Sequence, residues 1–196
     1  MFTGLIEDLG ELVELERNEL GARLTIRSAL AGQLSEGDSV AVNGVCLTAT
    51  EISDESFSAD AINETLSRSS LGDAQLGSPL NLELPVRANG HLGGHIVQGH
   101  IDGVGSVAAT REDGIALVVT VAAAPELLRY VAEKGSIAVD GVSLTVARVD
   151  DQGFDVWLIP ETTQRTNLGG TAAGRTVNLE VDILAKYVER LLATSQ

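Results

Sequence analysis

Two matched positions in this sequence carry side chains that could do chemistry. The segment Asn43-Gly-Val-Cys-Leu-Thr48 contains the single cysteine, and Asp140-Gly-Val-Ser-Leu-Thr145 repeats the pattern with a serine in its place. A thiol and a hydroxyl at the same point of two copies could act as nucleophiles or steer an addition. On residue type alone, however, a lone cysteine is more often a small buried hydrophobe, and a serine in a strand is more often structural.

The three histidines, His91, His95 and His100, lie in one glycine-rich stretch. Imidazole is the commonest zinc ligand, but these residues lack the i, i+4 spacing of a helical metal site, and no cysteine or carboxylate completes a set nearby. We therefore expect no metal. His100 is the better candidate for an acid or base, because Gly4-Leu-Ile aligns with Gly99-His-Ile at an offset of 95 residues, which places His100 opposite Leu5. The residue type of Asp182 favours a helix N-cap, and a chemical role is the alternative.

An internal duplication supplies the elements that position these side chains. Placing Gly44 on Gly141 gives an offset of 97 residues, and the same offset carries Asn81-Leu-Glu83 onto Asn178-Leu-Glu180. A period of this length indicates two whole domains of one fold, not a solenoid of short units. The expected parts are two domains at residues 1–95 and 96–182 and a tail at residues 183–196.

Each domain is expected to be a small antiparallel β-barrel. Short runs of β-forming residues alternate with Gly, Asn, Asp and Ser turn signals, and in the first copy they predict strands at residues 10–15, 22–27, 39–42, 46–52, 56–60 and 79–84. We also expect the N-terminus to enter a strand at once. Residues 63–68 predict a helical turn stopped by Gly72, and Pro125 opens a second helix that ends before Gly135. Residues 85–100 form a loop that leads into the second domain.

The tail carries the stripe of an amphipathic helix. Its apolar residues recur at spacings of one, three and four: Ile183, Leu184, Tyr187, Val188, Leu191 and Leu192. A helix that follows two complete barrels has no core of its own to cover. We therefore expect its stripe to meet other copies of the chain, and small domains of this size are often steadied in this way.

Charge and cysteine content exclude several classes of partner. The 28 acidic residues against 13 basic ones give a formal net charge of −15, which disfavours nucleic acid and anionic membranes. One cysteine forms no internal disulfide, and no apolar run reaches the length of a membrane span. No secretory signal pattern is present, so the cytoplasm is the expected compartment.

Along its whole length the chain resembles the alpha-type, trimeric riboflavin synthases. The segments that carry the resemblance lie in both copies: residues 1–7, 43–48, 64–66, 93–101, 134–146, 159–162 and 178–182. The resemblance implies two tandem Greek-key β-barrels, each a lumazine-binding repeat, plus a C-terminal helix that holds a homotrimer. It implies no cofactor, and it leaves open an association with a lumazine synthase shell.

The reaction that the resemblance implies fits a duplicated chain. Two molecules of 6,7-dimethyl-8-ribityllumazine would exchange a four-carbon unit, giving riboflavin and 5-amino-6-(D-ribitylamino)uracil. Donor and acceptor are then the same compound, so two similar pockets suit the task. Each active site would lie between subunits, where the first barrel of one meets the second barrel of its neighbour.

The same resemblance assigns roles to named residues. His100 would transfer protons with help from Ser143 and Thr145, Cys46 and Ser143 would steer addition at C7 of the acceptor lumazine, and Asp182 would orient or polarise it. The first barrel's pocket would use Cys46, Leu47, Thr48 and the run Asp60, Ala61, Ile62, Asn63, Glu64 and Thr65. The second barrel's pocket would use Gly99, His100, Ile101, Lys134, Ser143, Leu144 and Thr145. By the repeat, the two pockets would be completed by Gly4, Leu5 and Ile6 and by Leu158, Ile159, Pro160, Glu161, Thr162 and Thr163.

Two other functions remain as alternatives. Bacterial lumazine proteins share the implied fold and bind their ligand without catalysis, but they lack several pocket residues, including the set Cys46, His100 and Ser143 that is present here. A flavin-binding reductase domain has a similar barrel, but no nicotinamide-binding βαβ fingerprint follows in this sequence. Which group is the nucleophile stays open.

Overall fold

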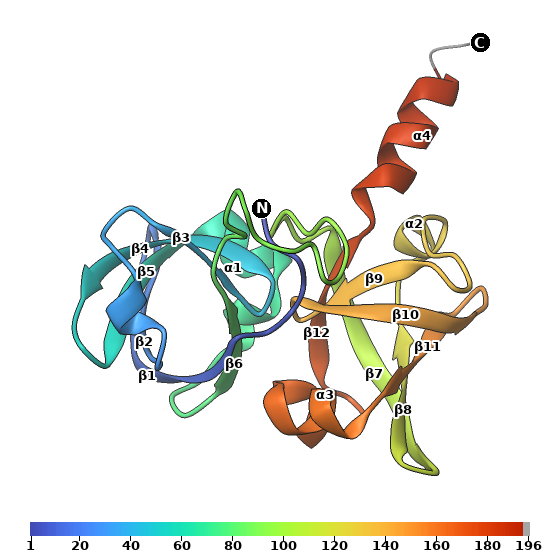
Figure 1. Ribbon diagram of the computed structural model, residues 1–196, viewed down its shortest axis with the longest axis horizontal. Helices are drawn as coiled ribbons and strands as arrows, with labels where there is room; N and C mark the ends of the chain where they lie inside the picture. Colours follow the sequence, from blue (N-terminus) through green and yellow to red (C-terminus); the bar gives the residue numbers. More distant parts are fainter. Residues whose placement is uncertain (194–196) are drawn as a thin grey trace.

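The computed structural model describes residues 1–193, most of which fold into two closed antiparallel barrels that lie side by side (Figure 1). The order of strands is β1-β2-β5-β4-β3-β6 in the first barrel and β10-β11-β8-β7-β12-β9 in the second. Under the repeat, β7 to β12 correspond to β1 to β6, and the two circular orders are then identical. The expected fold class, two barrels of one fold followed by a helix, is confirmed.

Each barrel is built from six strands. The strands of the first barrel are β1 (Asp8–Asn18), β2 (Gly21–Arg27), β3 (Ser39–Val42), β4 (Val45–Ile52), β5 (Ser56–Ile62) and β6 (Pro79–Glu83). Those of the second are β7 (Gly103–Asp113), β8 (Ala116–Ala122), β9 (Ser136–Val139), β10 (Val142–Val149), β11 (Gly153–Leu158) and β12 (Thr176–Val181). Strand β2 pairs with β5 and β3 pairs with β6, so the connections are of the Greek-key type.

Alternating apolar residues fill the inside of each barrel. In β2, Ala22, Leu24 and Ile26 are buried while Arg23 and Thr25 between them are half-buried, which is the period of a strand with one face on a core. The largest core side chains are at matched positions, Phe57 in the first barrel and Phe154 in the second. The two barrels therefore have separate cores.

Four short helices lie outside the barrels: α1 (Asn63–Arg68), α2 (Pro125–Leu128), α3 (Pro160–Arg165) and α4 (Ile183–Ala193). Helix α1 agrees with the prediction, but it ends before Gly72, which lies in a following 3-10 turn (Ser70–Asp73). Helix α2 is a single turn, shorter than expected. Helix α4 agrees with the predicted amphipathic helix and projects away from the second barrel (Figure 1). Within residues 1–193, no helix is long and apolar enough to cross a bilayer.

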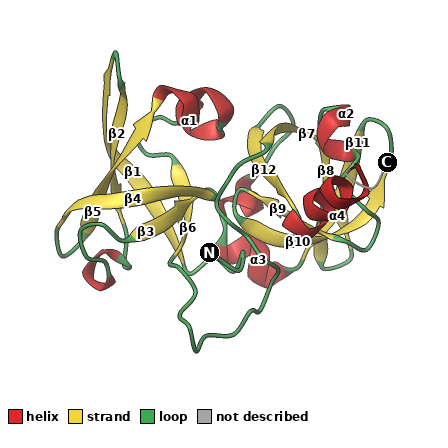
Figure 2. Ribbon diagram, turned by 90° about the horizontal axis from the view of Figure 1, so that it is seen from above, coloured by secondary structure: helices red, strands yellow, loops and turns green. Residues whose placement is uncertain are grey.

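The N-terminal segment corrects one expectation, because it does not enter a barrel strand at once. Strand β1 begins at Asp8, and the residues before it pass between the barrels (Figures 1 and 2). There Phe2 forms an isolated antiparallel bridge with Val97, with N–H to carbonyl distances of 2.7 and 3.1 Å. Phe2 and Val97 are buried together with Ala41 and Ala138, which makes a small apolar cluster at the junction.

Candidate active site

Two tight hairpin turns bring the matched Cys46 and Ser143 strands together. Asn43 and Asp140 have positive φ values of 47° and 46°, as the first residue of an Asn-Gly or Asp-Gly turn requires. The turns meet backbone to backbone, because a Cβ atom on Gly44 would lie 2.7 Å from the backbone nitrogen of Gly141. Only glycine allows this approach.

The loops that precede the two barrels are exchanged between them. The Ser143 N–H of the second barrel donates to the Gly4 carbonyl at 2.8 Å, and the Cys46 N–H of the first barrel donates to the Gly99 carbonyl at 2.8 Å. Ile6 packs against the second core, and Ile101 packs against the first. The sequence analysis assigned Gly99 to Ile101 to one pocket with Ser143, whereas in this structure the Gly99 loop contacts the Cys46 strand.

Two buried glutamates hold the exchanged loops. Glu83 accepts hydrogen bonds from the backbone N–H groups of Thr3 and Gly4 at 2.6 and 2.9 Å. Glu180 accepts from those of Gln98, Gly99 and His100 at 2.6, 2.9 and 3.0 Å. Burial raises the pKa of both carboxyl groups, and the donated N–H groups oppose that rise.

The sequence analysis gave these glutamates no role. A signal for them was present, because a charged residue occupies the same place in both copies of an otherwise uncharged strand, after Asn81-Leu82 and after Asn178-Leu179. A carboxylate at such a buried position needs donors close by.

A second histidine, His95, is the one that contacts Ser143. The His95 Nδ1 and the Ser143 hydroxyl oxygen are 2.7 Å apart, and His95 is buried. Its Nε2 has no hydrogen-bond partner among the described residues. Burial lowers the pKa of His95, while the charge of Asp182 raises it. His100, which the sequence analysis preferred, is exposed and belongs to the loop that contacts Cys46.

The remaining predicted residues divide into wall and surface positions. Leu47, Leu144, Ala61 and Leu158 point into the barrel cores and are buried. Thr48, Thr145 and Lys134 are exposed, and so are most residues where β5 enters α1 and where β11 enters α3. At these two strand ends Ile62 and Ile159 are 64% and 56% exposed. In a single chain, these two strand ends are therefore exposed to solvent on one side.

All four predicted acidic residues already have partners, and two of them, Glu64 and Glu161, pair with Arg68 and Arg165 on their own helices. Asp60 forms a bidentate pair with Arg23, with nitrogen to oxygen distances of 2.8 and 3.0 Å, and the guanidinium hydrogen bond lowers the pKa of Asp60. Asp182 accepts the Leu184 N–H at 3.0 Å, so it caps α4 as its residue type indicates.

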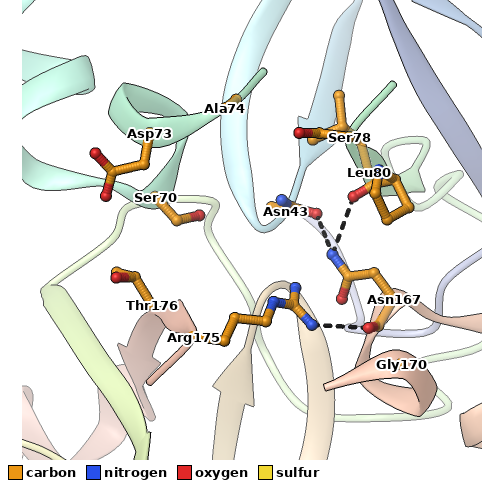
Figure 3. A pocket seen from close by; sticks show the side chains of 11 residues that line it. Asn43, Ser70, Asp73, Ala74, Ser78, Leu80, Asn167, Gly170, Arg175 and Thr176 are labelled. Carbon is orange, nitrogen blue, oxygen red and sulfur yellow. Dashed lines mark hydrogen bonds between the residues drawn. The ribbon is translucent and has the colours of Figure 1, made fainter. Parts of the chain in front are cut away.

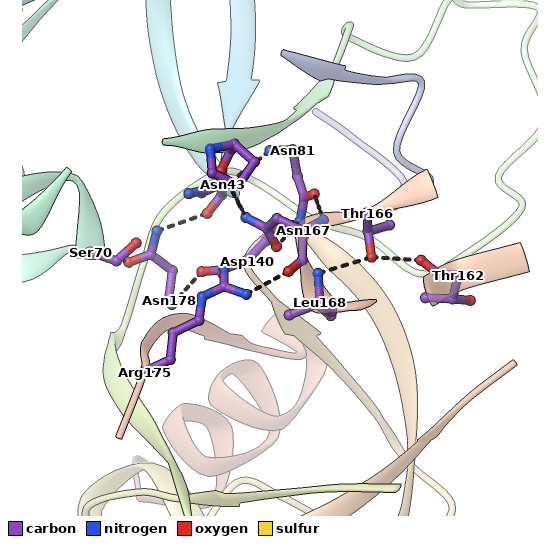
Figure 4. A network of polar contacts seen from close by, with 11 residues as sticks. Asn43, Ser70, Asn81, Asp140, Thr162, Thr166, Asn167, Leu168, Arg175 and Asn178 are labelled. Atoms are coloured by element: carbon purple, nitrogen blue, oxygen red, sulfur yellow. Dashed lines mark hydrogen bonds and ion pairs between the residues drawn. The ribbon is translucent and has the colours of Figure 1, made fainter. Parts of the chain in front are cut away.

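Beneath the two turns lies a buried polar network that follows the repeat (Figure 4). The Asn81 side chain donates to the Asp140 carbonyl at 2.9 Å, and the matched Asn178 side chain donates to the Asn43 carbonyl at 2.9 Å. Each asparagine amide thus satisfies a backbone carbonyl of the other barrel. The network ties the barrels together at the same junction that holds the exchanged loops.

The two halves of the network differ in charge. Asp140 replaces the neutral Asn43, and its carboxylate pairs with Arg175 at 2.5 Å (Figure 4). A pocket of about 390 Å³ lies beside this pair, lined among others by Asn167 and Arg175 (Figure 3). None of the residues described as lining it belongs to the predicted site, so this pocket is separate from Cys46 and Ser143.

Comparison with known proteins identifies the fold and then the family. The model for the Lumazine binding domain matches residues 3–85 and 98–182, so each barrel is one such domain. Crystal structures of LumP with 6,7-dimethyl-8-(1'-D-ribityl) lumazine and with riboflavin superimpose with TM-scores of 0.84 and 0.86, cover 92% of this chain and 99% of theirs, and share 23% and 24% identity with it. At this identity they show the common fold.

Full-length relatives are more similar in sequence. Riboflavin synthase of Actinobacillus pleuropneumoniae is 47% identical over 98% of this chain and 90% of its own. Riboflavin synthase of Mycobacterium tuberculosis (strain ATCC 25618 / H37Rv) is 47% identical over the whole of both chains, and that of Bacillus subtilis (strain 168) is 38% identical over 98% of this chain and 90% of its own. The chain belongs to the riboflavin synthase family.

Proposed function

We propose that this protein is a riboflavin synthase, a transferase that converts two molecules of 6,7-dimethyl-8-ribityllumazine into riboflavin and 5-amino-6-(D-ribitylamino)uracil. The observation that carries the proposal is a pair of equivalent half-sites that differ in chemistry. One contains Cys46 with the loop of His100, and the other contains Ser143 with His95 and the loop of Leu5. Full-length identity to relatives named riboflavin synthase supports the same conclusion.

The chemistry needs a base and two rings held in register. The 7-methyl protons of the lumazine are acidic because the resulting carbanion delocalises into the heterocycle. His100 is exposed on its anchored loop and is the proposed proton carrier. Ser143, with its hydroxyl hydrogen-bonded to His95, and the exposed Thr145 supply polar groups for the second ring. Holding both rings in one geometry lowers the barrier, because the entropic cost of bringing them together is met by binding.

Cys46 and Asp182 have supporting roles in this proposal. Cys46 and Ser143 steer the addition at C7 of the acceptor. Asp182 is near enough to His95 to influence its pKa, which supports an orienting role on the Ser143 side beyond its role as the cap of α4. The exposed strand ends at Ile62 and Ile159 would line the two lumazine pockets.

We propose further that the active protein is a homotrimer with sites between subunits. Helix α4 is tied to its own barrel by polar contacts, since Lys186 pairs with Asp102 at 2.5 Å and Glu189 pairs with Arg129 and Tyr130. Its apolar stripe faces outward: Leu184, Tyr187, Val188 and Leu192 are 57% to 65% exposed. Other copies of α4 would cover this stripe and bring a Cys46 half-site to the Ser143 half-site of a neighbour. We place the reaction in the cytoplasm, where the free Cys46 stays reduced.

Incubation of the purified protein with 6,7-dimethyl-8-ribityllumazine alone tests the function. Buffer with a chelator removes metals, riboflavin is followed by absorbance, and both products are quantified. Equal amounts of riboflavin and the pyrimidine are expected. Lumazine binding without riboflavin formation would refute the enzyme and would leave a ligand carrier.

A further inference from the structure

The two buried glutamates stand at equivalent places in the two barrels. Glu83 of β6 and Glu180 of β12 are each 3% exposed. Within residues 1–193 neither forms an ion pair: Glu83 accepts from two N–H groups and the Thr3 hydroxyl, and Glu180 accepts from three N–H groups. A buried carboxylate is costly without such donors, so the donor loops and the carboxylates specify each other's position.

The strand register places each glutamate in line with a candidate catalytic side chain. Glu83 lies opposite Ala41, and Ala41 lies opposite Cys46. In the second barrel Glu180 lies opposite Ala138, which lies opposite Ser143. Each carboxylate is thus two strands away from the reactive position of its own barrel.

The loop that each glutamate holds serves the other barrel. The backbone of Gly99 donates to Glu180, while its carbonyl accepts the Cys46 N–H at 2.8 Å. The backbone of Gly4 donates to Glu83, while its carbonyl accepts the Ser143 N–H at 2.8 Å. Each loop is therefore held by two contacts: a glycine N–H donates to a carboxylate of one barrel, and the carbonyl of the same glycine accepts from a strand of the other barrel.

We propose that Glu180 is a positioning residue for His100 in the Cys46 half-site, and that Glu83 positions Leu5 in the Ser143 half-site. This inference rests on the proposed riboflavin synthase function. Glu180 acts on His100 directly, because the His100 N–H donates to the carboxylate oxygen that also accepts from Gly99. The His100 side chain stays exposed to solvent while its backbone is held.

A carboxylate is required because all three contacts at Glu180 are donated to it. Two oxygens accept three N–H groups, at 2.6, 2.9 and 3.0 Å. In Glu180→Gln one oxygen becomes an amide that donates, so it opposes at least one of these N–H groups. The volume of the side chain is almost unchanged, and the substitution therefore perturbs the loop with little effect on the barrel core.

A double-mutant cycle with His100 tests the proposal. We expect Glu180→Gln to lower kcat at least about tenfold with less than about a threefold change in KM, because proton transfer depends on placement. In a His100→Gln background the same change should lower kcat less than about twofold, because the group it positions is already absent. Equal effects in the two backgrounds, or an unchanged kcat in Glu180→Gln, would overturn the role.

Glu83→Gln is the matched control, since its loop carries Leu5 and not His100. Its effect should be the same with and without His100→Gln and should shrink in a Leu5→Ala background. Coupling of Glu83→Gln to His100 as strong as that of Glu180→Gln would show a general loss of structure and refute the assignment. If Glu180→Gln fails to fold, Glu180→Asp, which keeps the charge but withdraws it by one methylene, takes its place in the cycle.

The test separates the inference from the function on which it rests. A wild-type protein that forms no riboflavin removes the proposed function. Hydrogen exchange of the Gly99 and His100 amides then still reports the contact, and it should accelerate in Glu180→Gln and stay unchanged in Glu83→Gln. Riboflavin formation together with an uncoupled cycle removes only the positioning role.

Discussion

Replacing Arg175 with serine should destabilise the protein more at high pH than at low pH, and adding Asp140→Asn should restore most of the loss. Asp140 is fully buried and pairs with Arg175 at 2.5 Å. The double variant reproduces the first barrel, in which Asn43 and Ser78 occupy the equivalent positions. The sequence thus contains its own neutral version of this part of the network.

The magnitude follows from the pKa of Asp140. Burial raises this pKa from 3.8 to about 6 even though the Arg175 guanidinium opposes the rise. A group with a raised folded pKa gives stability that is full below its unfolded value and is lost as pH rises through the folded value. The full loss, from well below pH 4 to well above pH 6, is about 3 kcal/mol in the wild type. Removing Arg175 leaves the charge unpaired, and because the carboxyl can instead stay protonated, the added loss is limited to about 1.4 kcal/mol for each pH unit above 6.

Urea unfolding at pH 5, 6, 7 and 8 provides the assay. Arg175→Ser should approach the wild type at pH 5, where the carboxyl of Asp140 takes up a proton, and fall well below it at pH 8. The double variant should be about 3 kcal/mol more stable than Arg175→Ser at pH 8. Equal urea midpoints for Arg175→Ser and the double variant at pH 8 would refute the argument.

Four further substitutions test the site and the assembly. Val188→Asp should dissociate the oligomer in sedimentation and abolish riboflavin formation in parallel, because a charge on the exposed stripe of α4 cannot be buried against another copy, and a fully active monomer would contradict the shared site. Cys46→Ser and Ser143→Ala should lower turnover more than lumazine binding measured by fluorescence, and weakened binding alone would make them pocket walls. Gly4→Ala should cost about 2 kcal/mol, because φ is +77° and the new Cβ would lie 2.6 Å from that of Ser143, and it should speed exchange of the Ser143 amide about 30-fold.

The barrels and the final helix could be predicted because their signals are local. Alternation along β2, the turn residues before Cys46 and Ser143, and the stripe of α4 each act within a few residues. The offset of 97 residues added the equivalence of the two halves. Helix α2 was overestimated, because the apolar spacing after Pro125 continues into a turn in which the Tyr130 N–H bonds to the Leu127 carbonyl.

The exchange of the loops could not be predicted from the repeat. An offset shows that Gly4 and Gly99 are equivalent, but it is the same whether each loop stays on its own barrel or crosses to the other. The contact between His95 and Ser143 depends on that crossing and was missed for the same reason. His95 also precedes the part of the second copy that aligns with the first, so no equivalent residue drew attention to it.

The exchanged loops also determine when the first barrel can finish folding. Domains generally fold in order as the chain leaves the ribosome, so this barrel forms first. The Cys46 N–H can then form its hydrogen bond only after Gly99 has been synthesised. The Asn43 carbonyl can accept its hydrogen bond only after Asn178, which follows it by 135 residues, has been synthesised. Contacts of such long sequence separation form late. The Cys46 half-site is therefore completed only at the end of synthesis. In a chain truncated before β12, the Gly99 loop that contacts the Cys46 strand lacks its hydrogen bonds to Glu180.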